Sequence, residues 1–361
     1  MSEVNKSTVL FCPTDEDGFG APFQDQFRKA LSQLAGGLNL NSAAPWALKI
    51  PFDAPGKANA VSSELIQAAG EGLSAVEIPV GPSFENLSIT TEGLDTAQGL
   101  KKRAEKLNLQ AFRVGDDPAM PSGEILLLSE ECSLPSVDLC AVASEAGGML
   151  LLNAVRPHPF LGMGGALFSL GVGILDRATK LRLHRDVKPT VDTPLCAGCG
   201  SCLAACIFDA ISISSGRAMI DHKLCTGCGE CMNACHLGGI GPENGANIPR
   251  FQKMVAEAAF AVARKSTAGG NGSLLYVNFL TPLSSQTGGS FGRDRSLKRS
   301  FGALLSTDPV ALDQATWDLL VKGAVHGLRQ WSGFMIEPTP LMERATALGI
   351  GRRQYELTTS V

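Results

Sequence analysis

The chain has 361 residues, of which 44% are hydrophobic and 18% charged, and its formal net charge at pH 7 is −4. This composition excludes a disordered protein, because disordered chains combine few apolar residues with a high charge. The weak negative charge also lacks the basic surface of a nucleic-acid-binding protein, so nucleic acid is not expected as a partner.

No segment of the sequence is suited to cross a membrane. The longest apolar stretch, residues 163–175, contains four glycines and is shorter than the roughly 20 residues that a spanning helix needs. Residues 1–12 carry early charges and lack the apolar core of a secretory signal. We therefore expect a cytoplasmic protein, in which eleven cysteines point to metal binding rather than to disulfides.

The first part of the chain alternates between strand-like and helix-like segments. The apolar run 8–11 predicts a strand, and Phe27, Leu31 and Leu34 recur at helical spacing within residues 24–35. Residues 148–155 form a continuous apolar run, which is typical of a strand buried on both faces. This order predicts a parallel or mixed sheet with covering helices. Further strands are expected at 46–52, 75–80, 111–114 and 124–128, and further helices at 62–72 and 94–107.

Two cysteine runs follow, both with the spacing C-x2-C-x2-C-x3-C, and their neighbouring residues repeat as well. The repeat indicates an internal duplication, and the spacing is that of bacterial two-cluster ferredoxins, so we expect two [4Fe–4S] clusters. In such ferredoxins the fourth cysteine of each run ligates the other cluster. The first cluster is thereby assigned to Cys196, Cys199, Cys202 and Cys235, and the second to Cys225, Cys228, Cys231 and Cys206.

The residues between these cysteines favour close approach of the backbone to an inorganic core. Gly198, Gly200, Gly227 and Gly229 allow the chain to curl and to direct N–H groups at sulfur. Structural zinc is the alternative, but four zinc ligands would use only half of the cysteines. His236 stands where a proline usually follows the last cysteine; it is either an exposed turn residue or a neighbour of the first cluster. A segment of about 50 residues is too small for a hydrophobic core, so the clusters would supply its folding energy.

Behind the second cysteine run the α/β pattern resumes. Residues 249–265 predict a helix with one apolar face, 274–280 a strand, and 309–321 a helix that Thr307 or Asp308 can cap. The α/β domain is therefore predicted to be discontinuous. Residues 1–188 form its first part, residues 189–242 form a small α+β two-cluster ferredoxin-like domain, and residues 243–361 form its second part.

Several motifs resemble those of one protein family in their order along the chain. They are RPHPFLGMGGALFSLGVG at 156–173, Lys180 and His184, the double cysteine run, STDPVALDQA at 306–315, and the closing LGIGRRQYEL. Over roughly residues 46–357 the chain resembles the domain-of-unknown-function 362 family, whose members are described as uncharacterised iron–sulfur proteins. The resemblance implies an α/β domain interrupted by a two-cluster ferredoxin, and it brings no established reaction with it.

The resemblance also has departures. Arg156 and Pro157 replace the Lys-Gly that usually precedes His158, Phe168 and Ser169 replace a Lys-Asn, and a Cys-Asp-Cys is missing from 284–289. Gly162, Gly164 and Gly165 match the family, and close helix packing is their simplest role. The candidate acid/base or binding residues are those polar positions that match: His158, Lys180, His184, Asp308 and Asp313.

Some of these residues have structural alternatives. His158 can equally fix a rigid turn between two prolines, and Asp308 is most simply a helix cap. A basic run within residues 293–299 is either a solvated loop or a surface for an acidic electron-transfer partner. Cys12, Cys132 and Cys140 stand among apolar residues and are interpreted as small buried hydrophobes.

Three functions follow from these patterns. We favour an electron-transfer iron–sulfur protein, a subunit or partner of a larger redox system that carries electrons through two [4Fe–4S] clusters, because the cysteine runs are complete while the host motifs are altered. The second function is a reductase, an oxidoreductase with its own substrate pocket in the α/β domain that the clusters supply with electrons. The third is a scaffold that the clusters only stabilise. The expected partner is a redox protein or a multi-subunit oxidoreductase complex.

Overall fold

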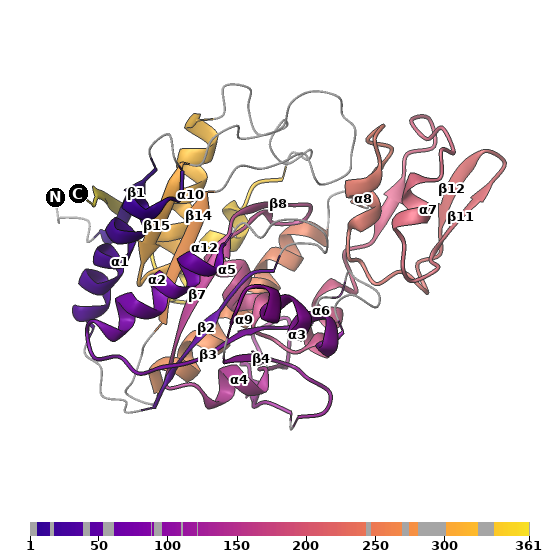
Figure 1. Cartoon of the computed structure of the whole chain (residues 1–361). Helices are drawn as coiled ribbons and strands as arrows, with labels where there is room; N and C mark the ends of the chain where they lie inside the picture. The colour runs from indigo at the N-terminus through magenta and orange to yellow at the C-terminus, as the bar shows by residue number, and fades with distance from the viewer. Residues whose placement is uncertain are drawn as a thin grey trace.

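The computed structural model describes residues 6–14, 18–38, 44–52, 61–87, 89, 96–109, 111–120, 122–242, 247–268, 274–280, 301–323 and 336–360. Its main element is an eight-stranded sheet in the order β16-β1-β15-β14-β7-β2-β3-β4 (Figure 1). The strand β15 runs antiparallel to both of its neighbours, and the other pairs are parallel. The predicted α/β class with a mixed sheet is therefore confirmed. The strands are β1 (Ser7–Pro13), β2 (Trp46–Lys49), β3 (Val80–Glu85), β4 (Phe112–Val114), β7 (Gly148–Ala154), β14 (Leu274–Leu280), β15 (Gly302–Ser306) and β16 (Tyr355–Thr359).

The strand β7 lies in the middle of this sheet, as its continuous apolar run predicts. Met149 and Leu151 belong to the apolar core on one face, and Leu150 and Leu152 belong to the core on the other. At the start of the strand, a Cβ atom on Gly148 would lie 2.4 Å from the ring of Trp46, so only glycine fits there. Burial on both faces thus explains why this strand shows no polar alternation.

Helices cover both faces of the sheet and make a three-layer molecule (Figure 1). Helices α1 (Ala21–Gly36) and α2 (Ser63–Ser74) cover one face. The other face carries α9 (Asn247–Ala268), α10 (Pro309–Gly323) and α12 (Thr339–Ala347). Smaller elements complete this body: α3 (Ala97–Lys106), β5 (Ile125–Leu127), β6 (Ser136–Asp138), α4 (Ala141–Glu145), β8 (Arg156–His158), β9 (Gly162–Gly164), α5 (Ala166–Phe168), the π-helical turn η1 (Ser169–Gly173) and α6 (Arg177–His184).

Two predicted strands lie elsewhere in the structure. Residues 75–77 close helix α2, where Glu77 takes a left-handed φ of 61°, so the strand β3 begins only at Val80. The segment 124–128 forms β5, which pairs with β6 in a separate two-stranded sheet and not in the main one. In each segment only part of the apolar run is buried: Ile78 in the first and Leu126 in the second, whereas Leu127 is exposed.

The chain leaves the α/β body after α6 and returns to it at α9. Between them, β10 (Pro189–Val191) and β13 (Ile240–Pro242) pair antiparallel, with Pro189 opposite Pro242. The segment between the two strands projects from the body as a separate lobe (Figure 1). We call residues 189–242 the lobe. Its other elements are α7 (Ser201–Ala205), β11 (Ile211–Ser214), β12 (Arg217–Ile220) and α8 (Glu230–Ala234).

The two ends of the chain meet at one edge of the main sheet (Figure 1). The strand β16 pairs parallel to β1, and Asp308 accepts hydrogen bonds from the Ser7 hydroxyl at 2.6 Å and from the Arg352 backbone N–H at 3.0 Å. Within the described ranges, every helix is too short or too polar to span a lipid bilayer.

Candidate functional site

The cysteines of the lobe sit on two loops that have the same conformation. In each loop two glycines have positive φ angles, 65° and 81° at Gly198 and Gly200 and 78° and 82° at Gly227 and Gly229. The second glycine of each loop immediately precedes a short helix, α7 or α8. Left-handed backbone is accessible to glycine without strain, which explains these four residues. The duplication in the sequence is therefore a duplication in structure.

One hollow of the lobe is lined by cysteines from both runs. Cys196, Cys199, Cys202 and Cys235 surround it, and its empty volume is about 310 Å³, part of which is open to solvent. Backbone N–H groups point at two of these sulfurs: Ala218 donates to Cys196 Sγ at 3.3 Å, and Gly239 donates to Cys235 Sγ at 3.2 Å. Three of these four cysteines belong to the first run, and Cys235 belongs to the second.

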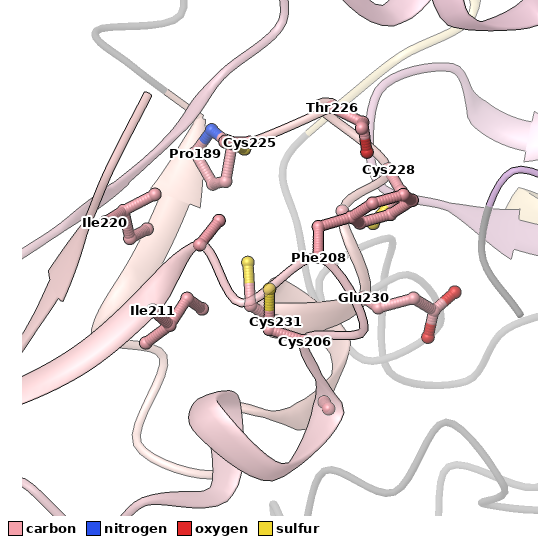
Figure 2. A pocket seen from close by; sticks show the side chains of 13 residues that line it. Pro189, Cys206, Phe208, Ile211, Ile220, Cys225, Thr226, Cys228, Glu230 and Cys231 are labelled. Atoms are coloured by element: carbon pink, nitrogen blue, oxygen red, sulfur yellow. The ribbon is translucent and has the colours of Figure 1, made fainter. Parts of the chain in front are cut away.

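The other hollow has the complementary set. Cys206, Cys225, Cys228 and Cys231 line a space with an empty volume of about 320 Å³. Figure 2 shows the side chains of Cys206 and Cys231 next to each other, between Ile211 and the ring of Phe208. Cys206 is the last cysteine of the first run, so the two runs exchange their fourth members.

Burial and mutual repulsion disfavour thiolates in both hollows unless a cation compensates their charge. Burial raises the pKa of Cys231, and negative charge on Cys228, Cys225 and Cys206 would raise it further. Burial likewise raises the pKa of Cys202, with Cys235 and Cys196 adding to the effect. Four thiolates around one hollow would therefore need a cation among them, and an iron–sulfur core with cysteine ligands would supply one. Among the residues that the structure describes, no three His, Cys, Asp or Glu side chains converge closely enough to hold a single metal ion.

The candidate histidines lie in the body, on the side that faces the lobe. A row of ring contacts joins them: His158 lies 6.2 Å from Phe160, Phe160 lies 5.9 Å from Phe251, and Phe251 lies 4.8 Å from His184. His158 Nδ1 accepts the backbone N–H groups of Phe160 and Leu161, both at 3.2 Å, which fixes the turn after β8. Burial lowers the pKa of His158 to about 3 and that of His184 to about 4, so both rings are neutral near pH 7.

Lys180 belongs to a buried polar group that includes residues outside the family motifs. Its Nζ donates to the Leu87 carbonyl at 2.9 Å. Burial lowers the pKa of Lys180, while the nearby carboxylates of Asp116 and Glu85 act in the opposite direction. Lys49 is also buried, and its Nζ lies 2.7 Å from Glu85 Oε1.

This polar group lies at the carboxyl ends of parallel strands, the edge at which ligands bind in open α/β sheets. Lys49 ends β2, Glu85 ends β3 and Asp116 follows β4. Sequence reasoning missed these three residues because they are far apart along the chain. A charged residue at or just after the end of each of these strands was the available signal.

Asp308 and Asp313 have structural partners. Asp308 Oδ1 accepts the N–H groups of Val310 and Ala311 at 2.9 Å and so caps α10, as predicted. Asp313 is buried, and its carboxylate accepts the N–H groups of Ala166 and Leu167 at 2.8 and 2.9 Å at the start of α5.

Asp313 also shapes the glycine motif. Asn278 Nδ2 donates to its carboxylate at 2.9 Å, and a Cβ atom on Gly165 would lie 2.3 Å from its Oδ1. Burial raises the pKa of Asp313 to about 6. Gly165 therefore provides the predicted close packing, against α10, whereas a Cβ atom on Gly164 would have only ordinary contact, 3.5 Å from Phe168. The helix α5 itself is short and is followed by the π-helical turn η1.

Two sequence features lie outside the described residues: segment 284–289, which lacks the family's Cys-Asp-Cys, and the basic run within 293–299. Of the remaining cysteines, Cys12 and Cys140 are buried, as predicted for small hydrophobes, whereas Cys132 is only half-buried.

Comparison with known proteins gives one family and several distant structures. No curated protein matches the chain. The lactate racemase apoprotein from Thermoanaerobacterium thermosaccharolyticum has 12% sequence identity and a TM-score of 0.41, with 88% of this chain and 57% of that chain covered. A protein from Thermotoga maritima has 11% identity and a TM-score of 0.36, with 90% and 59% covered. This chain thus spans less than two thirds of the length of either.

The family comparison agrees with the resemblance inferred from the motifs. The model named "Domain of unknown function (DUF362)" matches residues 47–318, which is most of the chain and includes the whole lobe. This protein belongs to the DUF362 family.

Proposed function

We propose that this protein is an electron-transfer iron–sulfur protein whose lobe holds two [4Fe–4S] clusters. The observation that carries the proposal is the exchange of fourth cysteines between two hollows of similar size, which is the ligand arrangement of two-cluster ferredoxins. Such clusters supply one-electron transfer. In this proposal residues 189–242 are a ferredoxin-like domain inserted between the two parts of the α/β domain, 1–188 and 243–361.

The residues of the lobe would hold and tune these groups. Eight thiolates provide the ligands, and the N–H groups of Ala218 and Gly239 stabilise negative charge on Cys196 and Cys235. Hydrogen bonds to cluster sulfurs raise reduction potentials, so these two donors would act on the first cluster. The physiological partner would be a redox protein or a larger oxidoreductase complex.

Metal and sulfide analysis of anaerobically purified protein tests the proposal. We expect about eight iron and eight inorganic sulfide per chain, with an electron paramagnetic resonance signal that appears on dithionite reduction and disappears on reoxidation. Cys199→Ser is expected to lower the iron content, and Cys132→Ser is the matched control, since Cys132 lies outside both hollows. Zinc without sulfide would contradict the proposal, and clusters that cannot be reduced would favour a scaffold.

A second function, a reductase with its own substrate pocket, is favoured by the group of two buried lysines, Lys49 and Lys180, and two half-buried carboxylates, Glu85 and Asp116. If this group takes part in turnover, Lys180→Met should reduce substrate turnover by about 10² or more while leaving the iron content unchanged. An electron carrier that has no substrate reaction of its own would transfer electrons to its partner equally well as wild type and as Lys180→Met. The comparison of wild type with Lys180→Met therefore separates the two functions.

A further inference from the structure

The duplicated cysteine loops can be compared position by position, because the second repeats the first 29 residues later. Gly200 corresponds to Gly229, and Leu203 corresponds to Met232. If the lobe did not contact the body, corresponding residues of the two loops would have similar contacts and similar exposed fractions. A difference between corresponding residues therefore shows which loop packs against the body.

The second loop is packed against the α/β body. A Cβ atom on Gly227 would lie 2.1 Å from the His184 carbonyl oxygen and 2.8 Å from that of Val187. A Cβ atom on Gly229 would lie 2.9 Å from the Pro159 side chain and 3.2 Å from the ring of Phe160. Backbone of this loop therefore touches α6 and the turn after β8.

The first loop faces away from the body. A Cβ atom on Gly200 would meet no other atom within 4 Å, and one on Gly198 would lie nearest to Gly216, inside the lobe. Cys199 is exposed, whereas its counterpart Cys228 is half-buried. The exposed fraction also differs between two corresponding apolar residues: Leu203 is 44% exposed and Met232 is 3% exposed.

We infer that the two cysteine sets have different places in one electron path, an inference that rests on the proposed function. The first set, Cys196, Cys199, Cys202 and Cys235, exchanges electrons with an external one-electron carrier. The second set, Cys206, Cys225, Cys228 and Cys231, exchanges them with the α/β body. In each step one electron moves: the carrier is oxidised as the first cluster is reduced, and the first is reoxidised as the second is reduced.

The contact surface of the second loop leads to the row of rings between His158 and His184. Phe160, which touches Gly229, begins the row of rings that ends at His184. His184 Nδ1 lies 2.7 Å from the Lys180 carbonyl oxygen, one turn back along α6. Electrons that reach the second set are therefore next to the face of the body on which His158, His184 and Lys180 lie.

The solvent exposure of each cluster tests the inference. Holoprotein is partially reduced with dithionite, and a soluble dysprosium chelate is added as a relaxation probe. We expect the microwave power that saturates the first cluster's signal to rise several-fold, and that of the second cluster to rise much less. The two signals are assigned with Cys199→Ser and Cys228→Ser; a variant that loses its cluster assigns the signal by its loss.

A pair of charge substitutions adds a kinetic measurement. Leu237 is 48% exposed and lines the first hollow, so Leu237→Lys should speed reduction by the dithionite anion and Leu237→Glu should slow it. The same changes at Leu127, which is 82% exposed on the body, are the control and should leave the rate unchanged. The reduction potential of the first cluster is measured in each variant by redox titration. This measurement separates electrostatic attraction of the dithionite anion from a change in the potential.

Two results would contradict the inference. They are equal relaxation enhancement of both clusters, or a stronger enhancement of the second. A holoprotein without any cluster signal would instead contradict the proposed function, so the two failures are distinguishable.

Discussion

His184 is a titratable residue of the body that lies beside the lobe, and its environment favours the neutral ring. The residue is 4% exposed, its ring packs against Phe251, and its Nδ1–H donates to the Lys180 carbonyl. Burial favours the neutral ring and lowers its pKa from 6.5 to about 4. A neutral histidine with both a donor bond and a ring contact stabilises the fold only while it stays uncharged.

The first prediction concerns pH. His184 contributes its full stabilisation above pH 6.5, and below this pH the unfolded chain gains a proton that the folded chain does not. The free energy of unfolding should therefore fall by about 1.4 kcal/mol per pH unit from this group, down to about pH 4. In anaerobic denaturant titrations, His184→Gln should show a shallower fall than wild type. Parallel pH profiles would show that His184 is not buried in its neutral form.

The second prediction concerns the exchanged cysteines. Cys206→Ser should damage the cluster held mainly by the second run, and Cys235→Ser should damage the cluster held mainly by the first, because each lines the other run's hollow. Electron paramagnetic resonance of each variant identifies the lost signal. Damage to the cluster of the variant's own run would refute the exchanged ligand sets.

Contacts between elements hold the body together on the face that carries α9. Glu257 on this helix is 2% exposed, and its Oε1 accepts hydrogen bonds from Arg344 Nε and Nη2 on α12 at 3.1 and 2.8 Å. Its other oxygen accepts the Ser133 backbone N–H at 2.8 Å. One buried carboxylate thus joins two helices and the loop between β5 and β6.

The third prediction tests this pair. Arg344→Met leaves the Glu257 carboxylate buried without its cation, which should lower the free energy of unfolding by about 3 kcal/mol. The double variant Arg344→Met/Glu257→Gln should lose less, because no uncompensated charge remains buried. Denaturant titrations of the wild type, both single variants and the double variant give the coupling energy. Equal losses in Arg344→Met and the double variant would mean that packing, not charge, connects the helices.

At the scale of the whole molecule, the body and the lobe differ in what fills their interiors. The body has two apolar layers on either side of an eight-stranded sheet. The lobe has two cysteine-lined hollows between short elements, with small paired strands at β10–β13 and β11–β12. Beside the hollows the lobe buries only a few apolar residues, among them Ile211, Ala218, Met232 and Ile240.

The fourth prediction follows from this difference. Anaerobic removal of iron with a chelator should unfold the lobe and leave the body folded, because a segment of this size without its clusters has too little apolar burial. Hydrogen exchange should then become fast in α7, α8 and the β11–β12 hairpin, and stay slow in β7, β14 and α9. Retained protection in an iron-free lobe would show that its apolar contacts suffice.

Much of the body follows from local patterns in the sequence. The run 148–155 predicts the central strand β7, and β14 and α9 appear within a few residues of the segments 274–280 and 249–265. Local patterns predict the wrong element where contacts with other parts of the chain determine the secondary structure. Residues 75–77 close α2 and Ile78 is buried behind them, and the hairpin that contains 124–128 lies on α9 with Leu126 buried.

The sequence by itself determined the α/β class, the family and the two cysteine runs, since these depend on spacing along the chain. Only the tertiary structure decided which residues meet: Lys49, Glu85, Asp116 and Lys180 come from four separate elements and gather because parallel strands end at the same edge. It also decided that the second cysteine loop touches the body while the first faces outward. Two loops with nearly the same local sequence have nearly the same conformation, so only packing against the rest of the molecule can distinguish them.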